Sequence, residues 1–122
     1  MNYSKELLVD LSKFLTKSAR QDVRLLALEN IRSLSNSTES LQLMEMENYL
    51  IETALFELFT DSSWECPIII VIFVNVAAIS SEFSSRLIEN EKVLWKCFRL
   101  VEENMVDAAK LLANLSRRFP TR

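Results

Sequence analysis

The chain has 122 residues, of which 49% are hydrophobic and 25% are charged, and its formal net charge is −3. This balance indicates one small folded domain and argues against disorder. The absence of Gly excludes a P-loop and a GxGxxG dinucleotide turn, and the absence of His excludes a Ser-His-Asp triad and most zinc sites. We therefore expect a binding protein, not an enzyme, with no catalytic residues, metal or cofactor.

The first half of the chain shows apolar residues at helical spacing. This spacing predicts one helix over 4–15 and a second over 20–34. The polar stretch 35–38 interrupts the pattern. A short helix over 39–44 and a longer one over about 46–59 are expected to follow.

The middle of the chain contains its longest apolar segment. Ser62 and Glu65 fit a capping box, and Pro67 falls in the first turn of the helix that we expect to end at Ile79. The β-branched run 68–74 is also compatible with a buried strand. Its length, its capped start and the flanking helices favour a helix.

The last part of the chain predicts three more helices. A short one covers 82–88, Asn90 is a plausible N-cap for one that ends at Val101, and Asn104 is a plausible N-cap for a last helix to about Arg118. No stretch alternates polar and apolar residues, so we expect an all-α fold without strands.

Composition also suggests the compartment and the buried residues. Cys66 and Cys97 lie among apolar residues and form no CxxC pair, so we expect buried free thiols. The apolar run 66–79 is shorter than the roughly 20 residues that span a bilayer, and no signal peptide is evident. We expect a cytoplasmic protein without a membrane partner, and we expect Trp64 and Trp95 to be core or partly buried.

Charge is distributed unevenly along the chain. The segment between Arg32 and Arg86 contains no Lys or Arg. It carries eight acids: Glu39, Glu45, Glu47, Glu52, Glu57, Asp61, Glu65 and Glu82. The two ends are more basic, and the overall pI near 5.0 lacks the basic footprint expected for a nucleic-acid partner.

The most informative feature is a repeat centred on Asn30, Asn75 and Asn114. In each copy the residues three before, two before and one after the Asn are apolar. The Asn recurs after 45 and then 39 residues, which matches the period of about 40–47 of armadillo and HEAT repeats. We therefore predict a short armadillo/HEAT-like helical solenoid of about two and a half repeats, covering roughly 1–36, 37–80 and 81–122 as one domain. A short helix precedes the second and third repeats, as in the three-helix plan of an armadillo repeat.

The three repeated asparagines suggest a binding role. On stacked helices they would form a ladder, in which each carboxamide offers both a donor and an acceptor to the backbone of an extended peptide. The alternative is that each Asn bonds its own helix or a neighbouring loop. Armadillo proteins that bind peptides through such a ladder place a Trp one turn before the Asn, where this chain has Leu26, Val71 and Lys110.

Basic residues lie near both ends of the proposed ladder. They are Arg24 in the second helix, and Lys110, Arg117 and Arg118 in the last. Their charges suggest an acidic partner surface. The alternative for Arg117 and Arg118 is that they only satisfy the last carbonyls and the dipole of their helix.

Three segments resemble those of the HGH-type armadillo family, which is unrelated to growth hormone. They are Glu-Leu-Leu-Val-Asp-Leu at 6–11, Asp-Val-Arg-Leu-Leu-Ala-Leu-Glu-Asn-Ile at 22–31 and Asp-Ala-Ala-Lys-Leu-Leu-Ala-Asn-Leu-Ser-Arg at 107–117. An Ile/Val-rich helix that ends in Val-Asn-Val at 74–76 lies between them, as in the family. The resemblance implies a cytosolic chaperone adaptor that helps newly made translation elongation factor 2 to fold, together with general chaperones.

Several alternatives remain at this point. The chain could be the N-terminal part of a longer solenoid or a shortened member of the family, and an uncapped apolar end could drive homodimerisation. It could also be a generic armadillo or HEAT scaffold in another pathway, such as transport or complex assembly. A four-helix enzyme that uses carboxylates would need inward-facing Asp or Glu residues at metal-ligand spacing, and the apolar stripes contain none.

Overall fold

The computed structural model describes residues 4–61 and 64–118, and of Arg118 only the backbone. These ranges contain seven α-helices and no strand, which confirms the predicted all-α class. The helices are α1 Lys5–Phe14, α2 Gln21–Leu34, α3 Glu39–Asp61, α4 Cys66–Ile79, α5 Ser81–Glu89, α6 Glu91–Glu102 and α7 Val106–Arg118. No helix in the described ranges combines the length and apolarity that crossing a bilayer requires.

Polar side chains define where several helices begin. Ser4, Ser80 and Asn90 accept hydrogen bonds from the backbone N–H groups of Leu7, Phe83 and Val93, and so cap α1, α5 and α6. Asn90 was predicted in this role. Pro at the start of α4 costs no hydrogen bond, as expected, and the β-branched run is helical.

One predicted cap, that of α7, is wrong. Asn104 does not cap α7: it follows the end of α6 in the left-handed region, with φ 66°. Its N–H donates to the Val101 carbonyl, and the Met105 N–H donates to that of Leu100, which is a Schellman motif. Asn takes here the position that Gly usually holds. The predicted capping box pairs Glu65 with Ser62, which lies outside the described residues; Glu65 itself immediately precedes α4 and its side chain accepts no cap hydrogen bond from the first turn of that helix.

The helix α3 contains a sharp kink at 46–49. Glu47, Asn48 and Tyr49 all have positive φ angles of 52–61°, so the chain makes a left-handed turn between two right-handed segments. The two predicted helices of this region are therefore real, and the second begins a few residues later than expected. Left-handed backbone costs a non-Gly residue about 1–2 kcal/mol, so other contacts must hold this turn.

An ionic cluster holds the kink. The Arg86 guanidinium on α5 donates to both Glu52 carboxylate oxygens, at 2.8 and 2.9 Å. It also lies 3.8 Å from the Glu45 carboxylate and 4.6 Å from the centre of the Tyr49 ring. Glu45, Tyr49 and Glu52 come from before, within and after the left-handed turn, so one cation joins all three parts of it.

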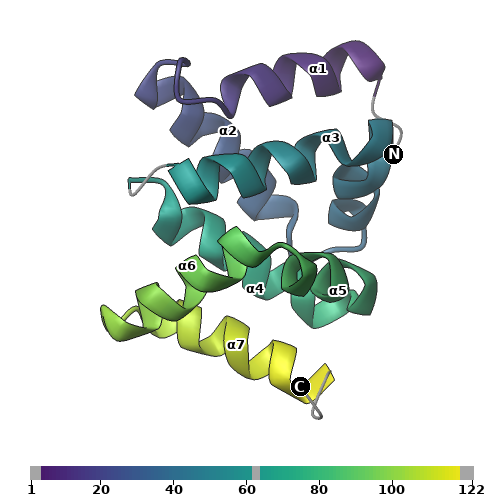
Figure 1. Ribbon diagram of the computed structural model, residues 1–122. Coiled ribbons are helices and arrows are strands. Elements are labelled where there is room, and N and C mark those ends of the chain that lie inside the picture. Colours follow the sequence, from purple (N-terminus) through teal and green to yellow (C-terminus); the bar gives the residue numbers. More distant parts are fainter. Residues whose placement is uncertain (1–3, 62–63, 119–122) are drawn as a thin grey trace.

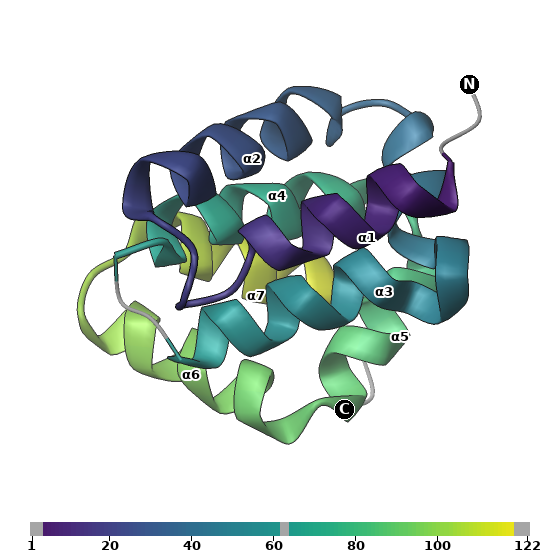
Figure 2. The ribbon, with the colours of Figure 1, turned by 90° about the horizontal axis from the view of Figure 1, so that it is seen from above.

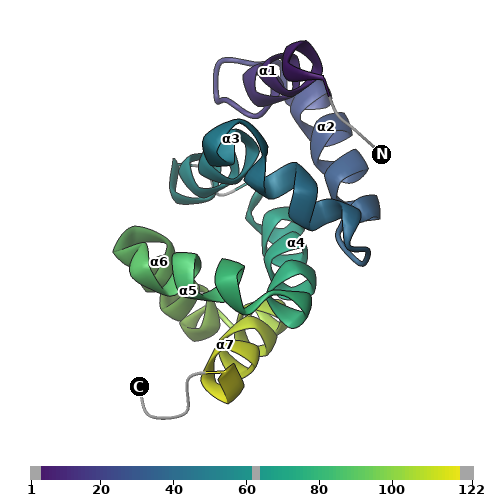
Figure 3. The same cartoon turned by 90° about the vertical axis from the view of Figure 1, so that its right-hand side faces the viewer.

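The helices form two layers (Figures 1 and 3). In one layer α3 packs between α1 and α6, with α5 beside α6; in the other, α4 packs between α2 and α7. Figure 2, seen from above, separates α2 and α4 from α3, α5 and α6. The helix α1 lies at one end of the molecule and α7 at the other (Figure 1).

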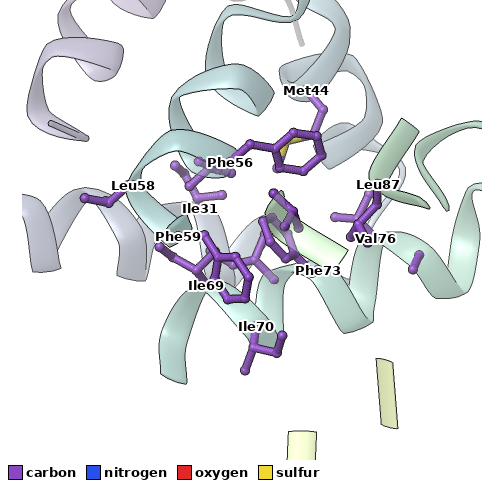
Figure 4. Packing of buried hydrophobic residues seen from close by; sticks show 14 of the residues in the cluster. Ile31, Met44, Phe56, Leu58, Phe59, Ile69, Ile70, Phe73, Val76 and Leu87 are labelled. Atoms are coloured by element: carbon purple, nitrogen blue, oxygen red, sulfur yellow. The ribbon is translucent and has the colours of Figure 1, made fainter. Parts of the chain in front are cut away.

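The helix α4 occupies the centre of the core. It has no charged residue and contacts α2, α3, α5 and α7. Its Phe73 ring lies 5.4 Å from that of Phe56, 5.2 Å from that of Phe59 and 5.8 Å from that of Phe83. Figure 4 shows Phe56 and Phe59 of α3 directed at Phe73 and at the neighbouring aliphatic residues of α4. Aromatic pairs of this kind add about 0.5–1.5 kcal/mol each beyond the area that they bury.

Replacing Glu47 with Gly is expected to stabilise the protein by about 1 kcal/mol, because Gly adopts the left-handed conformation without steric cost. The matched control is Glu57→Gly, at an exposed right-handed position of the same helix, which is expected to destabilise by about 0.5–1 kcal/mol. Urea denaturation measures both. Equal destabilisation by the two variants would mean that α3 is continuous in solution.

Replacing Arg86 with Met is expected to cost about 3–5 kcal/mol at pH 7, because the buried Glu52 carboxylate loses its partner. Burial already raises the pKa of Glu52 above its ordinary value of 4.5, against the opposing hydrogen bond from Arg86. In the variant the pKa rises further. The folded state then binds the Glu52 proton more tightly than the unfolded state. The stability that the protonated Glu52 contributes is therefore fully present below pH 4.5 and is lost as pH rises through the folded pKa.

The cost of Arg86→Met should therefore shrink as pH is lowered from 7 toward 4.5. Urea denaturation at several pH values measures this dependence. Arg32→Met is the control, because it breaks an exposed pair with Glu29 and should have a much smaller effect. A cost for Arg86→Met that does not change with pH would contradict the account.

Candidate protein-binding surfaces

The predicted ladder residues occupy three helices of one layer. Asn30 is on α2, Asn75 on α4 and Asn114 on α7, and α4 contacts both other helices. Asn30 is exposed, whereas Asn75 and Asn114 are partly buried. The structure thus brings the three onto neighbouring helices but gives them different environments.

Two of the three carboxamides bond within the chain. Asn75 Nδ2 donates to Ser35 Oγ at 2.9 Å, and Ser35 is buried at the end of α2, where its hydroxyl donates to the Arg32 carbonyl. Asn114 Oδ1 accepts a hydrogen bond from the Arg117 guanidinium one turn further on. These bonds correspond to the structural alternative for Asn75 and Asn114, and a role in binding a partner stays a prediction for all three.

Of the predicted basic residues, Arg24 is the most enclosed. Its Nε lies 3.0 Å from the carboxylate of the buried Glu65, and its Nη1 donates to the carbonyls of Lys17 and Ala19. Arg24 therefore joins α2 to the α1–α2 connection and to the start of α4. A guanidinium engaged in this way supplies little charge to a partner.

The basic residues of α7 are more accessible. Lys110 is exposed and lies 3.8 Å from Asp107 on the same helix. Arg117 is exposed as well. Arg118 is the last residue of α7, and its side chain lies outside the described part of the chain.

Two carboxylates that the sequence analysis did not identify as buried face inward. Glu52 and Glu65 are both buried, and each is paired with an arginine that is distant in sequence. Their burial could not be read from the local sequence, because the pairing of Glu52 with Arg86 and of Glu65 with Arg24 is a tertiary property. Within the described ranges no three His, Cys, Asp or Glu side chains are grouped so that they could hold a metal ion.

The predicted thiols are as expected. Among the described residues, neither Cys66 nor Cys97 forms a disulfide, and both are buried. Burial raises the pKa of both, that of Cys97 to about 12. Such thiols are poor nucleophiles at neutral pH.

The expectation for the tryptophans is wrong. Trp64 is 77% exposed and Trp95 is 70% exposed. Phe98, one turn after Trp95, is 46% exposed, and the two ring centres lie 6.0 Å apart. Such exposure of paired aromatic rings is typical of interaction sites, where aromatic residues are enriched.

A hollow accompanies this aromatic pair. It is open to solvent, has a volume of about 590 Å³ and lies between Thr60 near the end of α3 and one flank of α6. We call this region the α6 aromatic surface and define it by six of the residues that line the hollow: Thr60, Lys92, Trp95, Lys96, Phe98 and Arg99. Glu91 and Glu102 line the same hollow.

The orientation of α6 follows from its apolar stripe. Val93, Cys97 and Leu100 recur at helical spacing and are buried. At about 100° per residue, Trp95 and Phe98 fall on the opposite side of the helix. A helical projection could therefore have identified both as exposed. The feature that obscured them was the nearly continuous apolar run 93–98.

No family model, curated protein or solved structure matches this chain.

Replacing Asn75 with Ala is expected to cost about 1–2 kcal/mol of stability, because the change removes a partly buried hydrogen bond between α4 and the end of α2. Asn30→Ala is the control, since that side chain is exposed and a surface change usually stays within about 0.5 kcal/mol. Chemical denaturation compares them. If the two variants were equally stable, the Asn75–Ser35 bond would not support the fold.

Proposed function

We propose that this protein is a non-catalytic protein-binding module, built as a short armadillo/HEAT-like solenoid. The observation that carries the proposal is the α6 aromatic surface, where Trp95 and Phe98 remain exposed beside an open hollow. Exposed aromatic residues with a polar rim are typical of interaction sites. An apolar surface of this kind has no role in holding the core.

The order of the helices supports a solenoid. Each of the pairs α1–α2, α3–α4 and α6–α7 contributes one helix to each layer, and each pair packs on the next. The first segment of α3 and the helix α5 supply short helices ahead of the second and third pairs, in keeping with a three-helix repeat plan. In such stacks, neighbouring repeats complete one another's core and leave an extended surface for partners.

The resemblance to the HGH-type armadillo family makes a chaperone adaptor the leading proposal. In this proposal the rigid surface holds a partly folded domain of translation elongation factor 2 in the cytoplasm, with general chaperones as further partners. Asn30, with the exposed Lys110 and Arg117 of α7, remains available for contacts with the client. The second candidate is a generic scaffold in another pathway, and the identity of the client separates the two.

Affinity capture from eukaryotic cytosol, with the intact chain as bait and identification by mass spectrometry, tests the adaptor proposal. Enrichment of elongation factor 2 is the expected result. Trp95→Ala should lower that enrichment at least tenfold, because a large exposed aromatic residue is a frequent anchor of an interface. Trp64→Ala is the matched control, since it removes an equally exposed Trp that does not line the hollow.

Two results would contradict this account. Enrichment of unrelated proteins, with elongation factor 2 and general chaperones both absent, would replace the adaptor by the generic scaffold. Equal capture by the native chain and by Trp95→Ala would place the binding site elsewhere, with the Asn30, Asn75 and Asn114 helices as the next surface to test.

A further inference from the structure

The α6 aromatic surface combines apolar rings with a one-sided arrangement of positive charge. Lys92, Lys96 and Arg99 recur at i, i+4 and i+7 and therefore follow one flank of α6. Trp95 and Phe98 lie beside them. A ligand that fills the hollow meets both kinds of side chain.

The positive charges at the two ends of this flank form no ion pair with the described residues. Among the described residues, no carboxylate oxygen lies within 4.0 Å of the charged nitrogens of Lys92 or Arg99. The Lys96 amino group, by contrast, lies 5.5 Å from the centre of the buried Phe59 ring of α3 and is engaged within the chain. Charge complementarity therefore favours a negatively charged ligand.

We infer that the α6 aromatic surface binds an acidic peptide segment of a partner protein, whose apolar side chains pack on Trp95 and Phe98 while its carboxylates meet Lys92 and Arg99. The inference rests on the proposed function and names the class of partner for that surface. A volume of about 590 Å³ is within the range of about 300–1,000 Å³ in which proteins hold ligands.

The shape of the site favours a peptide over an anionic membrane. The rings border a hollow, into which side chains fit and a flat bilayer does not. Glu91 and Glu102 line the hollow at the two ends of α6 and would repel a continuous sheet of phosphate groups, whereas a short peptide can avoid them. Like charges placed opposite each other oppose binding.

Selection from a random peptide library displayed on phage, with the intact chain as the immobilised target, tests the inference. The expected peptides are rich in Asp and Glu and contain Leu, Phe or Trp. Synthetic copies should bind the native chain in fluorescence anisotropy and lose at least tenfold in affinity with Trp95→Ala. The affinity should also fall as salt is raised.

A charge reversal makes the test specific. The double variant Lys92→Glu and Arg99→Glu should lose at least tenfold in affinity for the acidic peptides and should bind copies in which Lys replaces their acids. Lys5→Glu with Lys13→Glu is the matched control, at two exposed positions of α1 away from the hollow, and should bind as the native chain does. Melting temperatures of all variants, which alter exposed residues, should stay close to the native value.

Several outcomes would overturn the inference. They are the absence of selected peptides, selection of basic or neutral ones, affinity unchanged by Trp95→Ala, or preferential binding to vesicles that contain phosphatidylserine. Self-association that is lost in Trp95→Ala would also overturn it, by making a second copy the occupant. Capture of elongation factor 2 alongside any of these results would leave the proposed function standing and remove only the acidic-peptide site.

Discussion

The structure depends on covering α4, a helix that contains no charged residue. Solvent exposure of α4 would leave a large apolar area in contact with water, at a cost of about 25 cal/mol per Å². Four helices, α2, α3, α5 and α7, pack on it. Its one carboxamide, Asn75, requires a hydrogen-bond partner at this depth and finds it in Ser35. The two layers and their order follow from this requirement.

Helical periodicity predicted the elements of the fold well, because the stripes of α1, α2, α6 and α7 each have one apolar side. The assignment of helix caps failed where one residue type is favoured in two different conformations. Asn is favoured both as an N-cap and in left-handed backbone, so Asn104 was assigned to the wrong helix end. In a chain without Gly, the left-handed positions at 47–49 and 104 fall to other residues, and local sequence does not mark them.

The candidate site was less predictable than the fold. Arg24 meets Glu65 across 41 residues, and Arg86 meets Glu52 across 34, so sequence alone showed these four residues only as surface charges. The repeated asparagines are locally similar, yet their burial and partners differ because their helices have different neighbours. The exposure of Trp95 and Phe98 could have been derived from the stripe of α6, whereas the hollow beside them also requires Thr60 of α3. The chemistry of a partner can therefore be inferred only from the assembled surface.

The central claim is that the exposed side of α6 binds the partner protein. This side does not contribute to the core around α4. A photoreactive benzoylphenylalanine at position 98, or at the exposed position 26 on α2, tests this claim most directly in a mixture with elongation factor 2, the proposed client. The account predicts a covalent adduct with the partner from position 98 and little or none from position 26. An adduct from position 26 alone would contradict it and would assign binding to the layer that contains α2, α4 and α7.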